Sequence, residues 1–356
     1  MKWTNFNIQT FKSITHFLLF PLSFIYGIIT STRNLLFDFG FFKEKTHPIP
    51  IICIGNLSVG GEGKTPHTQY LYDLLKIKYQ VAVLSRGYGR KTSTLQIVKI
   101  TSKASNVGDE PLQIKQNNPE CLVMVEKNRN KGVQHILQNF PKTEIILLDD
   151  GYQHRWIKVG FNILVTSFSS PYYDDYLMPL GRLREGKIGV TRANAVIFSK
   201  SPENTNPTLK KGMLEKLNLF SHQKAYFSVI KYHKFKSIIN NTDIEELDQY
   251  SITLVSGISN ANPLIEYLKE SGHSINHLKY SDHHNYSLHD IDNILAKHRA
   301  EESTKKLILT TEKDATKLRQ FSHHFKDINF YYIPIEIKID QSEIFKKQIL
   351  DYVEKN

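Results

Sequence analysis

The stretch that decides the fold is IPIICIGNLSVGGEGKTPHTQYLYDLL, residues 49–75. A short apolar run is followed by a glycine-rich segment, the pair Lys64-Thr65 and an amphipathic pattern. This order predicts a strand, a loop and a helix. Pro66 suits the first turn of that helix, where a missing N–H costs nothing. The loop N–H groups and the positive end of the helix dipole would together form a cradle for phosphate.

The candidate nucleotide-binding loop is Ser58-Val59-Gly60-Gly61-Glu62-Gly63-Lys64-Thr65. It matches the pattern G-x-x-x-x-G-K-[ST], except that Ser58 replaces the first glycine. Lys64 is predicted to reach the β- and γ-phosphates of ATP, and Thr65 to offer its hydroxyl to Mg²⁺. A plain glycine-rich turn is the alternative. A strand before the loop, a helix after it and Lys-Thr at the junction favour the nucleotide site.

Two other classes of phosphate-loop protein are disfavoured. ATPases that partition DNA carry a lysine just ahead of the paired glycines, and that position is Val59 here. GTPases read guanine with an N-K-x-D motif, whereas Lys313 and Asp314 are adjacent in the nearest candidate, TEKD. The loop therefore fits neither class.

The composition of the chain indicates which binding partners and which cellular compartment suit it. The 356 residues suffice for two domains, and the formal net charge is +11. That charge suits an anionic partner such as nucleic acid, a phosphorylated substrate or an anionic membrane face, although a generally basic surface would give the same value. The only cysteines, Cys53 and Cys121, lie in apolar runs and are predicted to be buried thiols. A reducing cytoplasm is the natural compartment.

The N-terminal segment suggests contact with a membrane. Residues 13–32, SITHFLLFPLSFIYGIITST, contain no Asp, Glu, Lys or Arg. A spanning helix needs roughly 20 apolar residues, and this segment includes His16, Pro21 and several hydroxyls. Aromatic and basic residues follow it, as in a helix lying at the interface. A spanning anchor, an interfacial helix and a buried core helix remain open; we favour membrane association, with the nucleotide loop facing the cytoplasm.

The rest of the chain alternates between apolar runs and helical patterns, which predicts an α/β fold with mainly parallel sheets covered on both faces. The pattern weakens around residues 207–248 and restarts at Ser251 without a second glycine-rich loop. We therefore expect two α/β/α units, the second smaller and Rossmann-like. The predicted ranges are residues 1–40 for the membrane-associated helix, 41–220 for the nucleotide domain, 221–250 for a β-ribbon linker and 251–356 for the C-terminal domain.

Polar clusters follow several predicted strands, where ligands bind in parallel sheets. Asp149 and Asp150 end a buried run and are suited to hold Mg²⁺, although a turn or helix cap would also explain them. The other clusters are weak when taken singly: Arg86 and Arg90 as phosphate contacts or solvated charges; Asp109 and Glu110 at a helix start; Asp282, His283 and His284; and Arg182, Arg184 and Glu185.

In this order the clusters resemble the tetraacyldisaccharide 4′-kinase family. The resemblance runs from about Pro21 to Leu318 and rests on seven motifs, GNLSVGGEGKTP, SRGYGRK, VGDEP, DDGYQHR, LMPLGRLRE, DHHNY and TTEKDATKL. It implies transfer of the γ-phosphate of ATP to the 4′-hydroxyl of a tetraacyldisaccharide 1-phosphate, giving lipid IVA. It further implies an N-terminal helix on the cytoplasmic face of the inner membrane, Mg²⁺ as a cofactor, and neither nucleic acid nor an obligate protein as partner.

The resemblance also assigns roles to residues. Lys64 and Thr65 match the phosphate-loop pair, and Asp109 with His283 matches the pair that deprotonates the sugar hydroxyl. Asp149, Asp150 and Glu185 match the acidic positions that the family has around Mg²⁺ and nucleotide. Arg184 matches a basic position beside them. The chain departs from the family at two positions where relatives often carry proline, Arg182 and Gly186.

Assigning Asp109 to the first domain and His283 to the second implies that the domains must close before the two side chains meet. Two other functions remain as alternatives. One is a phosphate-loop kinase or ATPase that acts on a soluble acceptor. The other is a membrane-tethered nucleotide switch, which would not need His283.

Overall fold

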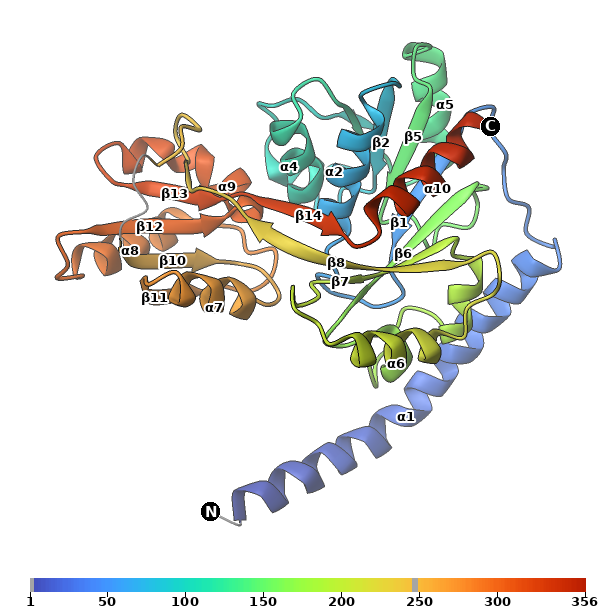
Figure 1. Cartoon of the computed structure of the whole chain (residues 1–356), viewed down its shortest axis with the longest axis horizontal. Helices are drawn as coiled ribbons and strands as arrows, with labels where there is room; N and C mark the ends of the chain where they lie inside the picture. The colour runs from blue at the N-terminus through green and yellow to red at the C-terminus, as the bar shows by residue number, and fades with distance from the viewer. Residues whose placement is uncertain (1–2, 245–248) are drawn as a thin grey trace. The chain divides into compact units, whose positions relative to one another are not determined.

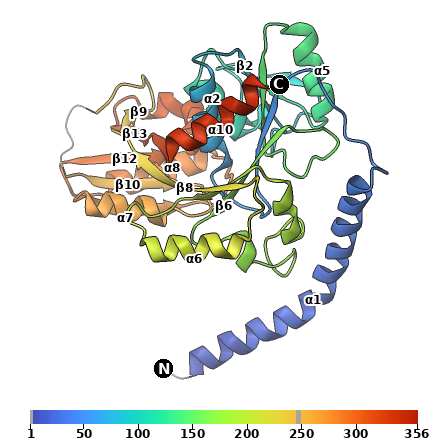
Figure 2. The same cartoon turned by 45° about the vertical axis from the view of Figure 1, so that its right-hand side comes forward.

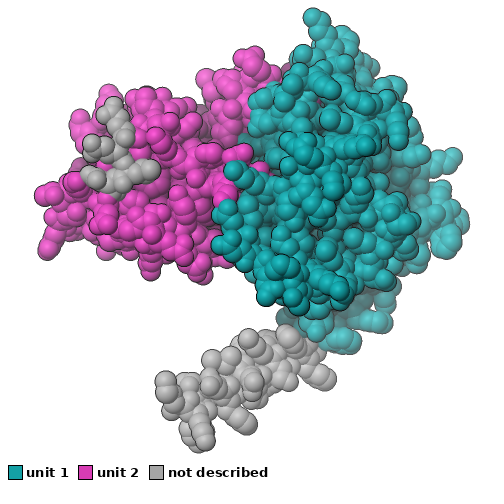
Figure 3. Space-filling view, viewed as in Figure 1, with its two compact units in different colours: residues 1–80, 129–229, 338–356 teal, residues 81–128, 230–337 magenta. Residues whose placement is uncertain are grey.

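The structure is a computed structural model that describes residues 3–244 and 249–356, and of residues 3–17 only the backbone. The chain forms two compact units, coloured separately in Figure 3. Unit 1 comprises residues 1–80, 129–229 and 338–356, and unit 2 comprises residues 81–128 and 230–337. Residues 81–128, which the sequence pattern assigns to the nucleotide domain, thus group with the C-terminal part of the chain.

Unit 1 is built on five parallel strands in the order β8-β7-β6-β1-β5. Their bounds are β1 Ile51–Gly55, β5 Ile145–Asp149, β6 Phe161–Ser167, β7 Ala195–Ser199 and β8 Lys224–Tyr232. Every residue of β1, β5 and β7 is buried. Burial on both faces explains why these strands read as continuous apolar runs.

Helices cover both faces of the unit 1 sheet, as Figures 1 and 2 show for α6 and α10. Successive side chains of β8 point to opposite faces of the sheet. Phe227 packs in a cluster with Met213 of α6, and Tyr226 packs against Phe345 of α10. The helices of unit 1 are α1 Trp3–Asp38, α2 Lys64–Leu75, α5 Arg129–Asn139, α6 Pro207–Leu217 and α10 Ser342–Glu354, with short 3₁₀ turns at η1 Tyr172–Asp174 and η2 Lys187–Arg192.

Unit 2 contains two groups of strands. In the first, β2 Val81–Ser85 pairs in parallel with β4 Leu122–Val125, and β3 Gln96–Ile97 adds antiparallel. The second has the order β11-β10-β12-β13-β9 and is parallel except at β9. Its strands are β9 Lys236–Ser237, β10 Ser251–Ser256, β11 Ser274–Lys279, β12 Lys306–Thr311 and β13 Phe330–Ile333, and β14 Ile335–Ile339 follows in the chain.

The helices of unit 2 bring its two chain segments together. α4 (Asp109–Asn117) comes from the first segment and α9 (Glu312–Leu318) from the second. Gln113 of α4 donates a hydrogen bond of 2.8 Å to Glu312 of α9, and both side chains are buried. The remaining helices are α3 Ala104–Val107, α7 Asn262–Glu270, α8 Leu288–Arg299 and the 3₁₀ helix η3 Arg319–Phe325.

Most predicted elements are present, and two apolar runs differ from the expectation. In the apolar run at residues 95–100 the strand β3 covers only Gln96 and Ile97, and Val98 adds one backbone hydrogen bond to Val123. The run at residues 328–335 divides into β13 and β14 at Pro334. Proline has no N–H for a ladder, so a strand break there is expected. Within the range predicted for the β-ribbon linker, residues 224–232 form the nine-residue strand β8, which neighbours β14 in the sheet. Cys53 and Cys121 are free and buried, as predicted.

The N-terminal segment forms one helix, α1, of 36 residues with Pro21 inside it. Within the described residues, we find no helix whose length and apolarity would let it cross the membrane.

Candidate functional site

The glycine-rich loop is shaped by left-handed glycines and held by backbone hydrogen bonds. Gly60 and Gly63 have φ values of 112° and 87°, a region that side chains disfavour, and α2 begins directly after Gly63. The Val59 N–H donates to the Arg182 carbonyl, and the Arg184 N–H donates to the Leu57 carbonyl, each at 2.7 Å. The loop is therefore fixed against residues 182–184 of the same unit.

Two of the candidate phosphate-binding cations, Lys64 and Arg184, share one carboxylate. Lys64 Nζ lies 3.5 Å from Asp150 Oδ1, and Arg184 Nη1 lies 3.0 Å from the same oxygen. Lys64 also donates to Asn56 Oδ1 at 3.2 Å. Burial opposes ionisation of Asp150, but Lys64 and Arg184 outweigh it and lower the pKa of this carboxyl. Both cations are thus gathered beside the loop that would receive a triphosphate.

The oxygen ligands predicted for Mg²⁺ lie where β5 and α2 meet. Asp149 is fully buried at the end of β5, and its Oδ1 accepts a hydrogen bond of 2.9 Å from Thr68 of α2. Thr65, one turn earlier in α2, is also buried. Among the residues that the structure describes, no three His, Cys, Asp or Glu side chains gather as a metal cage. Mg²⁺ in kinases is commonly held by one or two carboxylates and by substrate phosphates, so this donor set fits that ion.

Glu185 occupies a different position from the other predicted acids. Its carboxylate is buried and accepts hydrogen bonds from Asn34 at 2.7 Å, Gln153 at 3.0 Å and Arg192 at 2.8 Å. Gln153 also accepts from Arg184 at 3.4 Å, which links Glu185 indirectly to Asp150. The structure therefore places Glu185 at the junction of α1 and this network, where it orients its neighbours.

Arg182, one of the departures from the family pattern, has a clear structural role. Glu62 of the loop is buried, and burial raises the pKa of its carboxyl. Arg182 Nη1 lies 3.8 Å from Glu62, and its Nε donates to Asp175 at 3.0 Å. The guanidinium thus supplies the positive charge nearest to a buried acid of the nucleotide loop. Gly186 is the N-cap of η2, in extended conformation.

The predicted acid–base pair is assembled within unit 2. His283 Nδ1 lies 2.9 Å from Asp109 Oδ2. Asp109 is the first residue of α4, and His283 follows β11 with a left-handed φ of 59°. Asp109 and His283 belong to the same compact unit, so the expectation that two domains must close before they meet is wrong. Chain order alone places residues 81–128 with the nucleotide loop, whereas packing places them with residues 230–337.

The charges around this pair fix its protonation. Burial opposes ionisation of Asp109, but the hydrogen bond with His283 and the charges of Lys313 and Lys317 lower the pKa of its carboxyl far below the usual range. The same hydrogen bond raises the pKa of His283. Because Asp109 is ionised, it can only accept, so Nδ1 carries the proton and Nε2 is left as the basic nitrogen.

Two lysines of α9 complete the cluster, and sequence reasoning missed both. Lys317 Nζ lies 3.4 Å from Asp109 Oδ2, and Lys313 Nζ lies 3.2 Å from His283 Nε2. They are four residues apart and therefore lie on one face of the helix. The four-residue spacing of the two lysines within TTEKDATKL was the available signal.

The arginines of the segment after β2 differ in their surroundings. Arg86 is exposed, so its predicted contact with phosphate stays a prediction. Arg90 donates to the Thr94 carbonyl at 2.7 Å, which gives it a local structural role. Tyr88 lies between them in sequence, and its ring centroid is 5.4 Å from that of His283.

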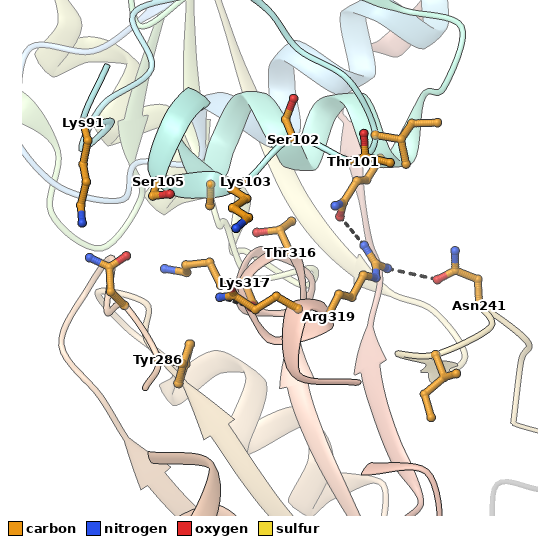
Figure 4. Close-up of a pocket in the computed structure, with 16 residues that line it drawn as sticks. Lys91, Thr101, Ser102, Lys103, Ser105, Asn241, Tyr286, Thr316, Lys317 and Arg319 are labelled. Atoms are coloured by element: carbon orange, nitrogen blue, oxygen red, sulfur yellow. Dashed lines mark hydrogen bonds between the residues drawn. The ribbon is translucent and has the colours of Figure 1, made fainter. Parts of the chain in front are cut away.

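A cavity of about 580 Å³ lies in unit 2 and is bounded in part by Lys317 (Figure 4). Arg319 is held at its wall by hydrogen bonds to Asn241, at 3.1 Å, and to Gln116. The lining residues also include Lys91 and Lys103, and no acid. Lys317 therefore connects the Asp109 carboxylate to a basic wall, whereas Lys313 does not line this cavity.

The chain is similar to known proteins along most of its length. Residues 15–354 match the model of the family described as tetraacyldisaccharide-1-P 4′-kinase. The tetraacyldisaccharide 4′-kinase of Bacteroides thetaiotaomicron is 40% identical, with 96% of this chain and 94% of the relative covered. That of Flavobacterium johnsoniae is 39% identical, with 95% and 97% covered.

One solved structure resembles the fold along most of its length. A crystal structure of LpxK from Aquifex aeolicus in complex with ATP has a TM-score of 0.74 and 28% sequence identity. The match covers 95% of this chain and 99% of that one.

Proposed function

The chain belongs to the tetraacyldisaccharide-1-P 4′-kinase family, and from that premise we propose how its residues carry out the reaction. The enzyme transfers the γ-phosphoryl group of ATP to the 4′-hydroxyl of a tetraacyldisaccharide 1-phosphate, which gives lipid IVA in lipid A biosynthesis. The observation that carries the proposal is the hydrogen bond of 2.9 Å between His283 and Asp109.

Lys64 and the loop residues 58–65 bind the triphosphate of ATP. The loop N–H groups and the start of α2 offer positive potential, and phosphoryl transfer depends mainly on such alignment and charge. In the structure Lys64 and Arg184 are paired with Asp150. Incoming phosphate oxygens would take over these cations, so the site is arranged for its anionic ligand in advance.

His283 acts as the general base. As the 4′-oxygen attacks the γ-phosphorus, its proton moves to Nε2, the new O–P bond forms, and the bond to the β,γ-bridging oxygen breaks. ADP leaves with that electron pair. Asp109 holds Nδ1–H and stabilises the imidazolium that results. A positioned general base contributes ~10²–10⁴ in rate.

Thr65, Asp149 and Asp150 would hold Mg²⁺ together with the phosphates, and that ion would neutralise charge on the transferring group. Glu185 would act on this centre through Gln153 and Arg184. Arg86 and Arg184 would contact phosphate groups of the substrates. The exposed position of Arg86 and the carboxylate partner of Arg184 support these roles.

The described face of α1 supports membrane association of the enzyme, at the cytoplasmic face of the inner membrane. Ser23, Tyr26 and Asn34 bind residues 177–185 of unit 1. The remaining surface of α1 exposes Leu18, Phe20, Leu22, Phe24, Ile25, Ile28, Ile29 and Leu35. A contiguous apolar surface of this kind commonly marks a membrane or lipid contact.

Vesicle binding tests this contact. Replacing Phe20, Phe24 and Ile28 by serine should abolish cosedimentation with vesicles containing anionic phospholipid. The matched control replaces Ile77 and Ile188, which are more exposed than the three α1 residues but lie elsewhere in the chain. Equal retention of both variants on vesicles would remove α1 from membrane binding.

The activity is tested with purified protein, γ-labelled ATP and tetraacyldisaccharide 1-phosphate. We expect a bis-phosphorylated lipid from the wild type, and almost none from Lys64→Ala. A deacylated disaccharide 1-phosphate serves as the soluble acceptor and should compete poorly. Equal phosphorylation of the soluble acceptor would contradict the lipid specificity, and full activity of His283→Ala would contradict the base.

A further inference from the structure

Lys313 contacts the reacting nitrogen of the base. Its Nζ lies 3.2 Å from His283 Nε2, 3.2 Å from Asp282 Oδ1 and 3.9 Å from Asp109 Oδ2. The imidazole is thus bonded at both nitrogens, to Asp109 at Nδ1 and to Lys313 at Nε2. Nε2 is the nitrogen that must receive the proton of the acceptor hydroxyl.

We propose that Lys313 is a positioning residue for the base: its ammonium donates to Nε2 of His283, keeps that nitrogen unprotonated in the resting enzyme, and yields its place to the acceptor hydroxyl. The inference rests on the proposed role of His283. It assigns to the second α9 lysine, Lys317, a different task, which is to neutralise Asp109.

The direction of the hydrogen bond follows from the charges. Burial opposes the charged form of Lys313, but Asp109, Glu110 and Asp282 raise its pKa. An ammonium has three donors and no acceptor. Nε2 must therefore supply its lone pair, which is available only while His283 is neutral. The contact and protonation at Nε2 exclude each other.

The groups that face His283 act in opposite directions. The hydrogen bond to Asp109 on α4 raises the pKa of the imidazole, and Asp282 in its own loop adds to this effect. Lys313 on α9 lowers that pKa. Tyr88 presents its ring at 5.4 Å, and Lys317 contacts Asp109 rather than the imidazole. Lys313 is therefore the cation that offsets the two carboxylates at the imidazole.

Release of Nε2 leaves the ammonium paired. Asp282 already accepts from Lys313 at the same distance as His283 does. When the hydroxyl enters, Lys313 can keep Asp282 while it gives up Nε2. After proton transfer, the imidazolium repels the ammonium, so the contact does not re-form until the product has left and the base has lost its proton.

Lys317 provides a matched control on the same helix. It carries the same charge, lies 3.4 Å from the same Asp109 oxygen and packs over the Tyr286 ring at 6.0 Å. It is more deeply buried than Lys313, and its contact is with Asp109 rather than with the imidazole. Removing either lysine subtracts one charge from the cluster, but only Lys313 contacts Nε2.

The test is an NMR titration of the full-length protein with ring-labelled histidine. The His283 signal is identified by its loss in His283→Gln. In Lys313→Met and Lys313→Gln we expect the titration midpoint of the His283 signal to rise by roughly one pH unit, because a neighbouring cation has been removed. In Lys313→Arg and Lys317→Met it should stay within a few tenths of the wild type. An unchanged midpoint in both neutral Lys313 variants, or an equal rise in Lys317→Met, would overturn the proposal.

The pH dependence of kcat/KM gives the second readout. The acid limb should move upward in Lys313→Met by the same amount as the NMR midpoint, and Lys313→Arg should restore it. A limb that does not move while the NMR midpoint does would remove Lys313 from catalysis. Because the titration needs no substrate, it decides on the contact with Nε2 independently of whether the lipid is phosphorylated.

Discussion

Asp150 in unit 1 and Asp109 in unit 2 are similar carboxylates with different partners. Each is largely buried, each faces two cationic side chains, and in each the surrounding charges lower the pKa against the effect of burial. Asp150 is paired with a lysine and an arginine, Lys64 and Arg184. Asp109 is paired with an imidazole as well as with lysine.

The difference in partners suits the two carboxylate clusters to different chemical tasks, which are exchange of anions and acceptance of a proton. Lysine and arginine stay charged throughout the physiological range, so the Asp150 cluster can exchange one anion for another without moving a proton. Histidine titrates near neutrality, so the Asp109 cluster can accept a proton. Both clusters also use a left-handed residue other than glycine, Asp150 at φ 52° and His283 at φ 59°. Such conformations cost on the order of 1–3 kcal/mol and commonly occur at functional sites.

The largest expected effect comes from removing the imidazole of His283, the group that distinguishes the Asp109 cluster from the Asp150 cluster. His283→Ala should lower kcat by ~10²–10⁴ and leave the KM for ATP nearly unchanged, because the base acts on the acceptor and not on the nucleotide. Steady-state kinetics with varied ATP and saturating lipid measures both. His284→Ala is the matched control, since His284 bonds instead to Asp290. An equal loss in both variants would mean that the loop, not the imidazole, matters.

Replacing the two carboxylates sharpens the comparison. Asp109→Asn should lower kcat by about 10²-fold and shift the acid limb of kcat/KM to lower pH, because His283 loses the charge that raises its pKa. Asp150→Asn should leave that limb in place and change ATP affinity instead, because its partners hold their charge. An equal shift of the acid limb in both variants would contradict the division of tasks.

A smaller effect concerns stability against pH. The pKa of His283 is raised in the folded protein, so its pair with Asp109 stabilises the fold fully below the unfolded pKa of histidine and loses this contribution as pH rises through the folded pKa. We expect about 1 kcal/mol or less, because the imidazole is partly exposed and solvent screens the pair. Urea unfolding of wild type and His283→Gln should differ more at pH 5.5 than at pH 8.5. The reverse order would show that the pKa is not raised.

The smallest expected effect lies at the edge of the Asp150 cluster. Arg182→Ala removes the guanidinium beside Glu62 and should cost less than about 1 kcal/mol, because Arg182 is half exposed. The KM for ATP should rise a few-fold as the loop loses a neighbouring charge. Thermal unfolding and ATP titration measure the two effects. Lys76→Ala, which removes an exposed pair at the far end of α2, is the control.

Local elements were predictable because each depends on a short stretch of chain. Three element boundaries fall where the sequence pattern indicates: α2 begins at Lys64, β5 ends at Asp149 and α4 begins at Asp109. Apolar periodicity, proline at a first turn and glycine at a left-handed position are properties of neighbouring residues. The nucleotide loop was readable for the same reason, whereas the pairing of Asp109 with His283 was implied only by the family resemblance.

The sequence by itself determined the kinds of chemistry available: a loop for phosphate, carboxylates at strand ends, and a histidine. Only the tertiary structure decided their grouping, because packing brings residues 81–128 beside 230–337 and thereby seats Asp109 against His283, Lys313 and Lys317. Long-range proximity depends on which faces bury together, and local periodicity does not encode that choice. For the same reason, only the tertiary structure shows that Lys313 contacts Nε2 of His283.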